Sequence, residues 1–523
     1  MSTVIFIGVL VTFILGYKIY GGYLSKLLEI NKDNPTPAIV KYDGSDFVPA
    51  KNWMILFGHH FASIAGAGPI VGPVLAYMSW GWLGTLLWIV LGTIFMGGIH
   101  DFLSLVISVR EGGQTIGNIS KEYISLRASK VFLGFLWFAL VIVIAVFASL
   151  CAKSFISQPE VVLPSLGLIP VAIFVGILIY NLRVNTAFST LIGLILLFLL
   201  VLGGELFKVK LNLANPYLFW IIVLFLYAFF ASILPVNILL QPRDYISSFL
   251  LFFGIGVSLI GLFIRPFPIR GAVLFKYSSS LGPLFPVMFI TVACGAISGF
   301  HSLVSSGTTS KQISSELHAK RIGLGAMVLE GVLATIALFS VAFVLKNPPN
   351  ASPMELFSLG FSKIAYFLGD YGKVVALVIL NAFILTTLDS ATRITRFITQ
   401  ELGGIKNKWV ATTIVILTGG YLGLTGQWQI LWPIFGASNQ LVAALALIVI
   451  SAWLISKKKN FKVAVIPAII MLTITTVALA LSMVKFFTQG NWLLFGISLA
   501  LLLMAGLVVD EFIRLKLRVS HTR

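Results

Sequence analysis

The sequence predicts an all-α polytopic membrane protein, and three observations support this. The chain is 58% hydrophobic and only 10% charged, with a mean hydropathy of +1.02, whereas soluble domains carry about 25% charged residues. Apolar stretches near the ~20 residues that cross a bilayer recur along the whole chain. One of these stretches, residues 53–78, is interrupted by glycine and proline. No segment resembles a soluble domain, so we expect a single transmembrane domain over residues 1–523.

The hydropathy pattern predicts about 15 membrane-spanning helices. The first, at 3–20, has no preceding basic region and no small-residue cleavage site, so we expect it to be retained. The predicted spans are 3–20, 53–78, 83–108, 131–151, 168–181, 187–203, 217–240, 247–264, 284–309, 324–346, 373–390, 411–425, 430–452, 463–484 and 492–510.

The basic residues predict the orientation of these spans. The net charge of +18 would also suit nucleic acid binding, but in a membrane protein Lys and Arg mark cytoplasmic loops. Most of them fall in alternate connections, including those around Arg183, Arg243, Arg393 and Arg396. This predicts an outside N-terminus and a cytoplasmic C-terminal tail at 511–523. The connection at 265–276 does not fit this pattern, because it is basic but predicted to lie outside.

Ten consecutive spans, residues 53–390, divide into two groups of five. A unit with an odd number of spans enters the membrane from opposite sides in its two copies, which is the inverted-repeat plan of many secondary transporters. Span 53–78 then pairs with 217–240, whose end carries Pro235, Gln241 and Pro242. Spans 3–20 and 411–510 are expected to be peripheral.

The interruption in span 53–78 predicts a binding site. Gly66, Gly68, Pro69, Gly72 and Pro73 prevent an ordinary helix there. Carbonyls freed by unwinding coordinate cations, and freed amides attract a carboxylate. The alternative is a proline kink with small residues for close packing. The predicted substrate-binding residues are His59, His60, Ser63, Gly66, Ala67, Gly68, Pro69, Pro235 and Gln241.

Residues 298–309 predict a hydroxyl-lined helix face. Ser298, Ser302, Ser305 and Thr309 follow helical spacing. With the carbonyl of Ala65 at the interruption, these oxygens suit Na⁺. The alternative is that each hydroxyl bonds back to its own helix.

Several buried titratable residues are candidates for a proton site or a gate. Asp389 and Arg393 lie four residues apart and can form an ion pair closing the cytoplasmic side, or Asp389 can carry a proton. His100 and Asp101 admit the same two interpretations, and His301 borders the hydroxyl face. Intramembrane ionisable residues are functional by default.

Other chemistry is not indicated. The sequence has no HExxH, G-x-S-x-G or GxxxxGK[ST] motif, so we expect neither hydrolysis nor ATP-driven transport. Cys151 and Cys294 lie in apolar spans, which excludes a disulfide framework. We expect no enzyme activity and no cofactor, with Na⁺ or H⁺ as a possible coupling ion.

Five segments resemble the carbon starvation protein A (CstA) family. They are FGHHFASIAGAGPIVGP at 57–73, LLQPRDY at 239–245, SGFHSLVSSGTTSKQ at 298–312, LDSATRITRFITQEL at 388–402 and WPIFGASNQLVAALAL at 432–447. The resemblance implies a bacterial or archaeal inner-membrane transporter linked to starvation, taking up peptides or pyruvate. It also implies a five-plus-five core of the LeuT and amino acid–polyamine–organocation type. It makes Ser305 and Ser306 candidate ion ligands.

These observations together predict a secondary active transporter of peptides or of pyruvate-like carboxylates. Its expected partners are the lipid bilayer and its substrate, with the oligomeric state left open. Two alternatives are a haem-bearing electron-transfer subunit, using His59, His60, His100 or His301 as axial ligands, and a nutrient sensor without transport.

Overall fold

A computed structural model describes residues 2–269, 276–346, 349–424 and 428–521. Within these ranges 13 helices are long and apolar enough to cross a membrane, so the chain is a multi-pass membrane protein. Predicted span 411–425 corresponds to a shorter apolar helix, Lys408–Leu424, with residue 425 outside the described part. Predicted span 284–309 is interrupted at residues 296–298 and is not among the 13.

The first half of the chain runs from α1 to α13. Its helices are α1 (Ser2–Leu15), η1 (Gly16–Tyr20), α2 (Gly21–Leu28), α3 (Pro37–Val40), α4 (Trp53–Ile64), α5 (Gly68–Trp80), α6 (Trp82–Gly92), η2 (Thr93–Gly97), α7 (Gly98–Arg110), α8 (Ile116–Tyr123), α9 (Leu126–Ser157), η3 (Pro159–Val161), α10 (Val162–Gly176), η4 (Ile177–Asn181), α11 (Thr186–Leu206), α12 (Pro216–Ile233) and α13 (Leu240–Ile264).

The second half begins with a small antiparallel hairpin and continues to the C-terminus. Its elements are β1 (Ser278–Ser279), β2 (Gly282–Pro283), η5 (Leu284–Met288), α14 (Phe289–Val292), η6 (Ala293–Gly295), α15 (Gly299–Gly307), η7 (Thr309–Lys311), η8 (Glu316–His318), η9 (Lys320–Leu324), α16 (Gly325–Ala342), α17 (Pro353–Ile364), η10 (Tyr366–Leu368), α18 (Tyr371–Gly403), α19 (Lys408–Leu424), α20 (Trp428–Ser456), α21 (Lys462–Thr488) and α22 (Trp492–His521).

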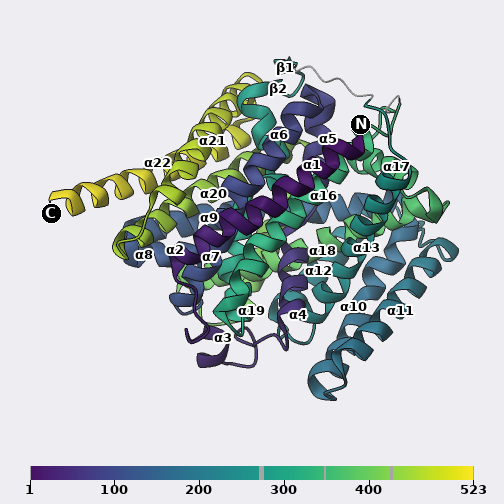
Figure 1. Cartoon of the computed structure of the whole chain (residues 1–523), viewed down its shortest axis with the longest axis horizontal. Helices are drawn as coiled ribbons and strands as arrows, with labels where there is room; N and C mark the ends of the chain where they lie inside the picture. The colour runs from purple at the N-terminus through teal and green to yellow at the C-terminus, as the bar shows by residue number, and fades with distance from the viewer. Residues whose placement is uncertain (1, 270–275, 347–348, 425–427, 522–523) are drawn as a thin grey trace.

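Two long helices form the centre of the molecule. α9 and α18, with 32 and 33 residues, pack extensively against each other, and most of α18 is buried. Figure 1 shows α10 and α11 as a pair at one edge, α21 and α22 at the opposite side, and α1 running across the face of the bundle. The buried central helices therefore carry the polar residues, while the outer helices present apolar side chains to lipid.

The structure corrects the predicted positions of three arginines. Arg243 lies inside α13, and Arg393 and Arg396 lie inside α18, all buried, whereas the sequence placed them in cytoplasmic connections. Hydropathy ended the predicted spans at the first charges. The helices continue because each buried arginine pairs with a carboxylate: Arg243 pairs with Asp389, and Arg393 and Arg396 share Asp46.

The two interrupted helices pack against each other. A Cβ atom on Gly68 would lie 2.6 Å from the Cys294 side chain, and one on Gly72 would lie 2.5 Å from the Val292 carbonyl oxygen. The glycines of α5 therefore bring the backbone of the first interrupted helix against that of the second.

Gly299→Ala should destabilise the protein. The new Cβ would lie 2.2 Å from the Asn439 carbonyl oxygen and 2.6 Å from the Ala443 backbone nitrogen, so α15 and α20 would have to separate. We expect a loss of about 1–3 kcal/mol, seen as a lower thermal unfolding temperature in detergent. Gly134→Ala in α9 is the matched control, because its Cβ would meet no atom within 4 Å. An unchanged unfolding temperature in Gly299→Ala would contradict the packing.

Candidate functional site

The first interruption lies where the sequence predicts it. α4 ends at Ile64 and α5 begins at Gly68, and Ala65 leaves the helical conformation with φ −75° and ψ 33°. The Thr387 hydroxyl of α18 donates to the Ser63 carbonyl at 3.2 Å. A Cβ on Gly66 would lie 2.7 Å from that hydroxyl oxygen. The unwound residues are thus held against the central helix α18.

A second interruption, at residues 296–298, was not predicted. The chain leaves its helical course after η6 and starts again at α15. Asn439 of α20 stabilises this restart: its Oδ1 accepts from the Phe300 amide at 2.9 Å, and its Nδ2 donates to the Ser298 hydroxyl at 2.9 Å. The one trace of it in the sequence is an amide residue, Asn439, within the apolar segment 432–447.

The proposed partner of the first interruption was therefore misplaced. Residues 234–239, which include Pro235, connect the separate spans α12 and α13, so they do not interrupt one span. Proline is found just beyond helix ends as well as at breaks inside helices, so the sequence pattern did not distinguish the two cases.

His59 lies at the centre of a buried hydrogen-bond network. Its Nδ1 is 2.6 Å from Oδ2 of Asp244 in α13, and its Nε2 is 3.2 Å from Nε2 of Gln312 and 3.4 Å from Oγ1 of Thr308. Ser63 is 3.5 Å from the same Asp244 oxygen. All five side chains are buried. The network links α4 with α13 and with the segment that follows α15.

Gln241 extends this network. Its Nε2 donates to Oε1 of Gln312 at 2.8 Å and to the Val48 carbonyl at 3.2 Å, and its Oε1 accepts from the Tyr180 hydroxyl. The structure therefore brings the predicted Gln241 within two hydrogen bonds of His59. Pro235 enters no such network and lies in the connection that precedes it.

A buried ion pair lies beside His59 and Asp244. Arg243 of α13 contacts the Asp389 carboxylate of α18, and the Tyr227 hydroxyl donates to the same carboxylate at 2.5 Å. Arg243 also lies 4.0 Å from Asp244. Asp244, Arg243 and Tyr227 were not predicted as site residues, although Arg243 and Asp244 are charged residues at the start of an apolar span.

A second acid–base cluster lies next to the restart of α15. His301 is 3.0 Å from Asp101 through Nδ1 and 3.3 Å from Glu330 of α16 through Nε2, and His100 is 3.1 Å from Asp101. All four are fully buried. The three predicted residues of this cluster therefore meet. Glu330 was missed, although it is a single carboxylate in an apolar span.

His60 points away from its neighbour. Its Nδ1 lies 2.8 Å from the Thr309 hydroxyl, while His59 faces Asp244. Successive residues of a helix point about 100° apart, as the sequence indicated.

The predicted hydroxyl face is bonded in several ways: Ser298 bonds to Asn439, Thr309 bonds to His60, and Ser302 bonds to its own helix. Ser302 donates to the Gly299 carbonyl at 2.8 Å, and Ser306 donates to the Ser302 carbonyl at 2.7 Å while accepting from the Ile116 amide. Ser305 differs, because its buried hydroxyl has no hydrogen-bond partner among the described residues. Its hydroxyl therefore has both its hydrogen and its oxygen lone pairs uncommitted.

The segment 43–50 closes one end of the site. Asp46 accepts from Arg393 at 2.6 Å and from Arg396 at 3.0 Å and 3.1 Å. Arg393 also donates to the carbonyls of Ala231 and Leu234 at the end of α12. Asp46 is thus held by two arginines of α18, and one of them, Arg393, also bonds to the end of α12.

The predicted pairing of Asp389 with Arg393 is corrected by these contacts. Asp389 pairs with Arg243, and Arg393 pairs with Asp46. The two side chains share a helix face, but each reaches a partner on another helix that also supplies further hydrogen bonds. Asp46 lies in a connection, where its sequence context carried no signal.

Charges around this segment shift two pKa values. Burial alone would raise the pKa of Asp46, but Arg393, Arg396 and Lys311 outweigh it and hold the pKa below its ordinary value. Burial lowers the pKa of Lys311 to about 8, and the nearby Asp46 carboxylate opposes that shift. The Lys311 ammonium lies 3.6 Å from the Phe397 ring centre.

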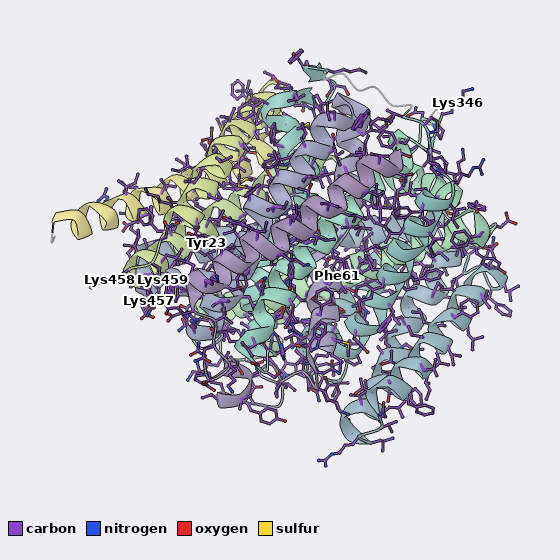
Figure 2. The ribbon with its side chains drawn as sticks, viewed as in Figure 1. Tyr23, Phe61, Lys346, Lys457, Lys458 and Lys459 are labelled. Carbon is purple, nitrogen blue, oxygen red and sulfur yellow. The ribbon has the colours of Figure 1, made fainter. Side chains whose placement is uncertain are left out.

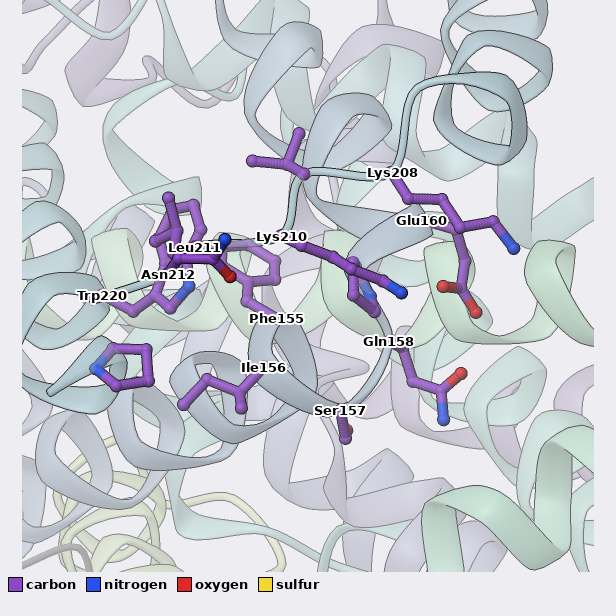
Figure 3. A pocket seen from close by; sticks show the side chains of 13 residues that line it. Phe155, Ile156, Ser157, Gln158, Glu160, Lys208, Lys210, Leu211, Asn212 and Trp220 are labelled. Atoms are coloured by element: carbon purple, nitrogen blue, oxygen red, sulfur yellow. The ribbon is translucent and has the colours of Figure 1, made fainter. Parts of the chain in front are cut away.

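A cavity of about 480 Å³ lies elsewhere, at the ends of α9 and α12. Figure 3 shows charged and amide side chains on one side of it and aromatic rings on the other, namely Gln158, Glu160, Lys208 and Lys210 against Phe155 and Trp220. Phe155 is ~12 Å along α9 from Phe147, which borders the first interruption. The cavity contains none of the predicted site residues.

The chain matches a known protein family and several known transporters. The family model of the carbon starvation protein CstA matches residues 1–351 and 349–478. The chain belongs to the CstA family. The peptide transporter CstA of Campylobacter jejuni is 33% identical, over 88% of this chain and 78% of that protein. The pyruvate/proton symporter BtsT of Escherichia coli is 30% identical, over 90% and 80%.

A solved structure has a similar fold. The manganese transporter of Eremococcus coleocola, in complex with an aromatic bis-isothiourea substituted compound, aligns with a TM-score of 0.53 at 13% identity, over 91% of this chain and 99% of that one. At this identity the likeness concerns the fold alone. In the described part of this chain, no group of three or more His, Cys, Asp or Glu residues is arranged to hold a metal ion.

Lys311→Met should remove a pH dependence of stability. The pKa of Lys311 is about 8 in the folded protein and near 10.5 when unfolded, so between these values the unfolded chain binds more protons and stability rises with pH. We expect unfolding temperatures to show that rise in the wild type and to lose it in Lys311→Met. Lys346→Met, at an exposed site labelled in Figure 2, should keep it. A rise that survives in Lys311→Met would contradict the assignment.

Proposed function

We propose that this protein is an ion-coupled secondary transporter that takes up peptides or pyruvate-like carboxylates, and that it is not an enzyme and needs no resident cofactor. The observation that carries the proposal is the meeting of two interrupted helices inside the membrane. Interrupted helices supply unpaired backbone groups for substrates and ions at mid-membrane. The transporter names of its relatives agree with this use.

We further propose a five-plus-five inverted repeat in which α10 and α11 are an insertion. The first unit comprises α4–α5, α6–α7, α9, α12 and α13, and the second comprises α14–α15, α16, α18, α19 and α20. This division differs from ten consecutive spans because it begins each unit with an interrupted helix. A two-span insertion leaves the orientation of the following helices unchanged, so the two units still run in opposite directions.

Three shared features support the repeat. Each unit begins with an interrupted helix and has its longest helix in third place, α9 or α18. Each also carries a short helix between its second and third spans, namely α8 and α17. Figure 1 agrees with the insertion, because α10 and α11 lie together at the edge of the molecule.

For the orientation we propose an outside N-terminus and a cytoplasmic C-terminus in a bacterial or archaeal inner membrane. Figure 2 shows Lys457, Lys458 and Lys459 together near Tyr23, far from Lys346. Clustered basic residues favour the cytoplasmic side. On this assignment the 43–50 segment closes the cytoplasmic end of the site.

The substrate carboxylate would bind at the start of α5. The first amides of a helix have no partner within it, and its dipole favours an anion. His59 and Ser63 lie one to two turns before this point on α4. A carboxylate is common to peptides and pyruvate, so both compounds suit this site.

Two kinds of coupling ion have a candidate site. Ser305 offers an unpartnered hydroxyl oxygen on α15, the helix that follows the second interruption, and such an oxygen suits Na⁺. The clusters around His59 and His301 offer titratable groups, which suit H⁺. Either ion would drive transport by binding more tightly to one state than to the other.

The deciding experiment uses proteoliposomes that contain only this protein. Labelled pyruvate and a labelled dipeptide are offered under an imposed Na⁺ gradient and, separately, a proton gradient. Accumulation of either compound above the external concentration establishes transport, and the effective gradient identifies the ion. Ligand binding without accumulation under either gradient would replace transport by a sensing role.

Gly68→Leu should abolish uptake. Even a Cβ at this position meets Cys294 at 2.6 Å, so a leucine side chain would force the two interrupted helices apart. We expect initial uptake to fall by more than about tenfold, because positioning at a binding site is sensitive to shifts of about 1 Å. The control is Gly8→Leu on α1, where a Cβ meets nothing within 4 Å. Normal uptake by a folded Gly68→Leu protein would refute the proposed site.

A further inference from the structure

The hydrogen-bond network around His59 determines which of its nitrogens carries a proton. Gln312 donates through Nε2 to the Thr308 carbonyl at 3.2 Å, and Gln241 donates through Nε2 to the Val48 carbonyl at 3.2 Å. A carbonyl can only accept, so both amides have a defined orientation. The amide nitrogen of Gln312 therefore faces Nε2 of His59 as a donor.

His59 is consequently neutral in this arrangement. Its Nε2 accepts from Gln312, so its proton resides on Nδ1 and is donated to Asp244 at 2.6 Å. This tautomer is assigned from the network, which is how imidazole protons are normally located.

The charges nearby attract a further proton. Arg243 carries one positive charge, whereas Asp244 and Asp389 carry two negative charges, and all three are fully buried. A neutral His59 leaves the group with one uncompensated negative charge, which is costly away from water. The titratable and charged groups around the imidazole are Asp244, Arg243, Asp389, His60, Tyr227 and Tyr180.

The closed network nevertheless opposes that proton. A proton on Nε2 would make His59 a donor on both nitrogens, so it would face the Gln312 amide donor at 3.2 Å. The Thr308 hydroxyl, 3.4 Å away, donates to the Val304 carbonyl and can accept from a protonated His59. Protonation therefore favours Thr308 as the partner and requires Gln312 to turn away.

Gln312 connects this choice to the closing segment 43–50. Its Oε1 accepts from Gln241, which holds the Val48 carbonyl, and its own carbonyl accepts from the Ala50 amide at 2.9 Å. Turning the Gln312 side chain away from His59 removes the Oε1 acceptor of Gln241, and Gln241 is the residue that holds the Val48 carbonyl. The same segment presents Asp46 to Arg393 and Arg396.

We propose that His59 is a proton switch for the cytoplasmic closure, such that protonation at Nε2 breaks its bond with Gln312 and releases the 43–50 segment. This rests on the proposed transport function and names its coupling ion. The proton enters from outside onto Nε2, the closure opens, and the proton leaves to the cytoplasm. Loss of the proton restores the Gln312 bond and the closure. His59 accepts the proton only when its bond with Gln312 is broken. The passage of the proton is therefore linked to the opening of the cytoplasmic closure.

The first test needs no substrate. Cysteine is placed at Ser45, which is half-buried in the closing segment, and its reactivity with a membrane-impermeant maleimide is measured across pH in detergent. Rates are normalised to the unfolded protein at the same pH, and the parent protein corrects for Cys151 and Cys294, which are both buried. We expect reactivity to rise by about tenfold on acidification, corresponding to ~1.4 kcal/mol of coupling.

Two variants probe the switch itself. His59→Gln cannot be protonated, so reactivity should stay low at every pH. Gln312→Glu replaces the facing donor with an acceptor, so a protonated His59 should be held rather than repelled, and the rise on acidification should vanish or reverse. His318→Gln, which removes an imidazole outside the network, is the matched control and should respond like the wild type.

Transport measurements complete the test. In proteoliposomes His59→Gln should lose accumulation driven by a proton gradient, whereas the matched control His318→Gln should retain it. A wild-type pH response in His59→Gln would overturn the switch. Loss of the pH response in His301→Gln alone would also overturn it, because that result would assign the proton to the second cluster. If the wild type carries neither compound, the proposed function fails, whereas the Ser45 cysteine still tests the switch.

Discussion

The structure depends on the contact between two interrupted helices in a region without water. Backbone groups released by unwinding cannot be exposed to lipid, so other parts of the protein must satisfy them. Thr387 of α18 does so at the first interruption, and Asn439 of α20 does so at the second. The glycines at 68 and 72 allow the close approach that joins the two. The long central helices are therefore needed both for packing and to complete the site.

The same constraint explains where the buried charges lie. Three carboxylates are each bonded to a side chain of a different element: Asp244 to the neutral His59, Asp389 to Arg243, and Asp46 to Arg393. An unpaired charge there would cost several kcal/mol or more. These contacts thus connect helices that must separate when the site opens. A change of protonation alters how strongly the helices are held together. The His59 network places such a change next to the cytoplasmic closure.

Much of the fold could be predicted from local properties. Hydropathy identified the membrane segments, and the dense glycine and proline of residues 66–73 identified the first interruption. The second interruption escaped because Cys294, Ala296 and Ile297 are ordinary helix residues in an apolar context. The bonds that stabilise the break there come from Asn439, which is distant in sequence. Likewise the ends of α13 and α18 were misplaced, since hydropathy treats every arginine as exposed.

The sequence by itself determined the class of protein, the position of the first interruption and the set of polar residues within the membrane. These follow from composition and local spacing, because apolar length and the conformational limits of glycine and proline act within one segment. Only the tertiary structure decided the partners. His59 contacts Asp244, whereas His60 contacts Thr309. His301 contacts Glu330, and Arg393 pairs with Asp46 rather than with Asp389. A buried charge takes the partner that packing brings within reach, and sequence spacing does not encode that distance.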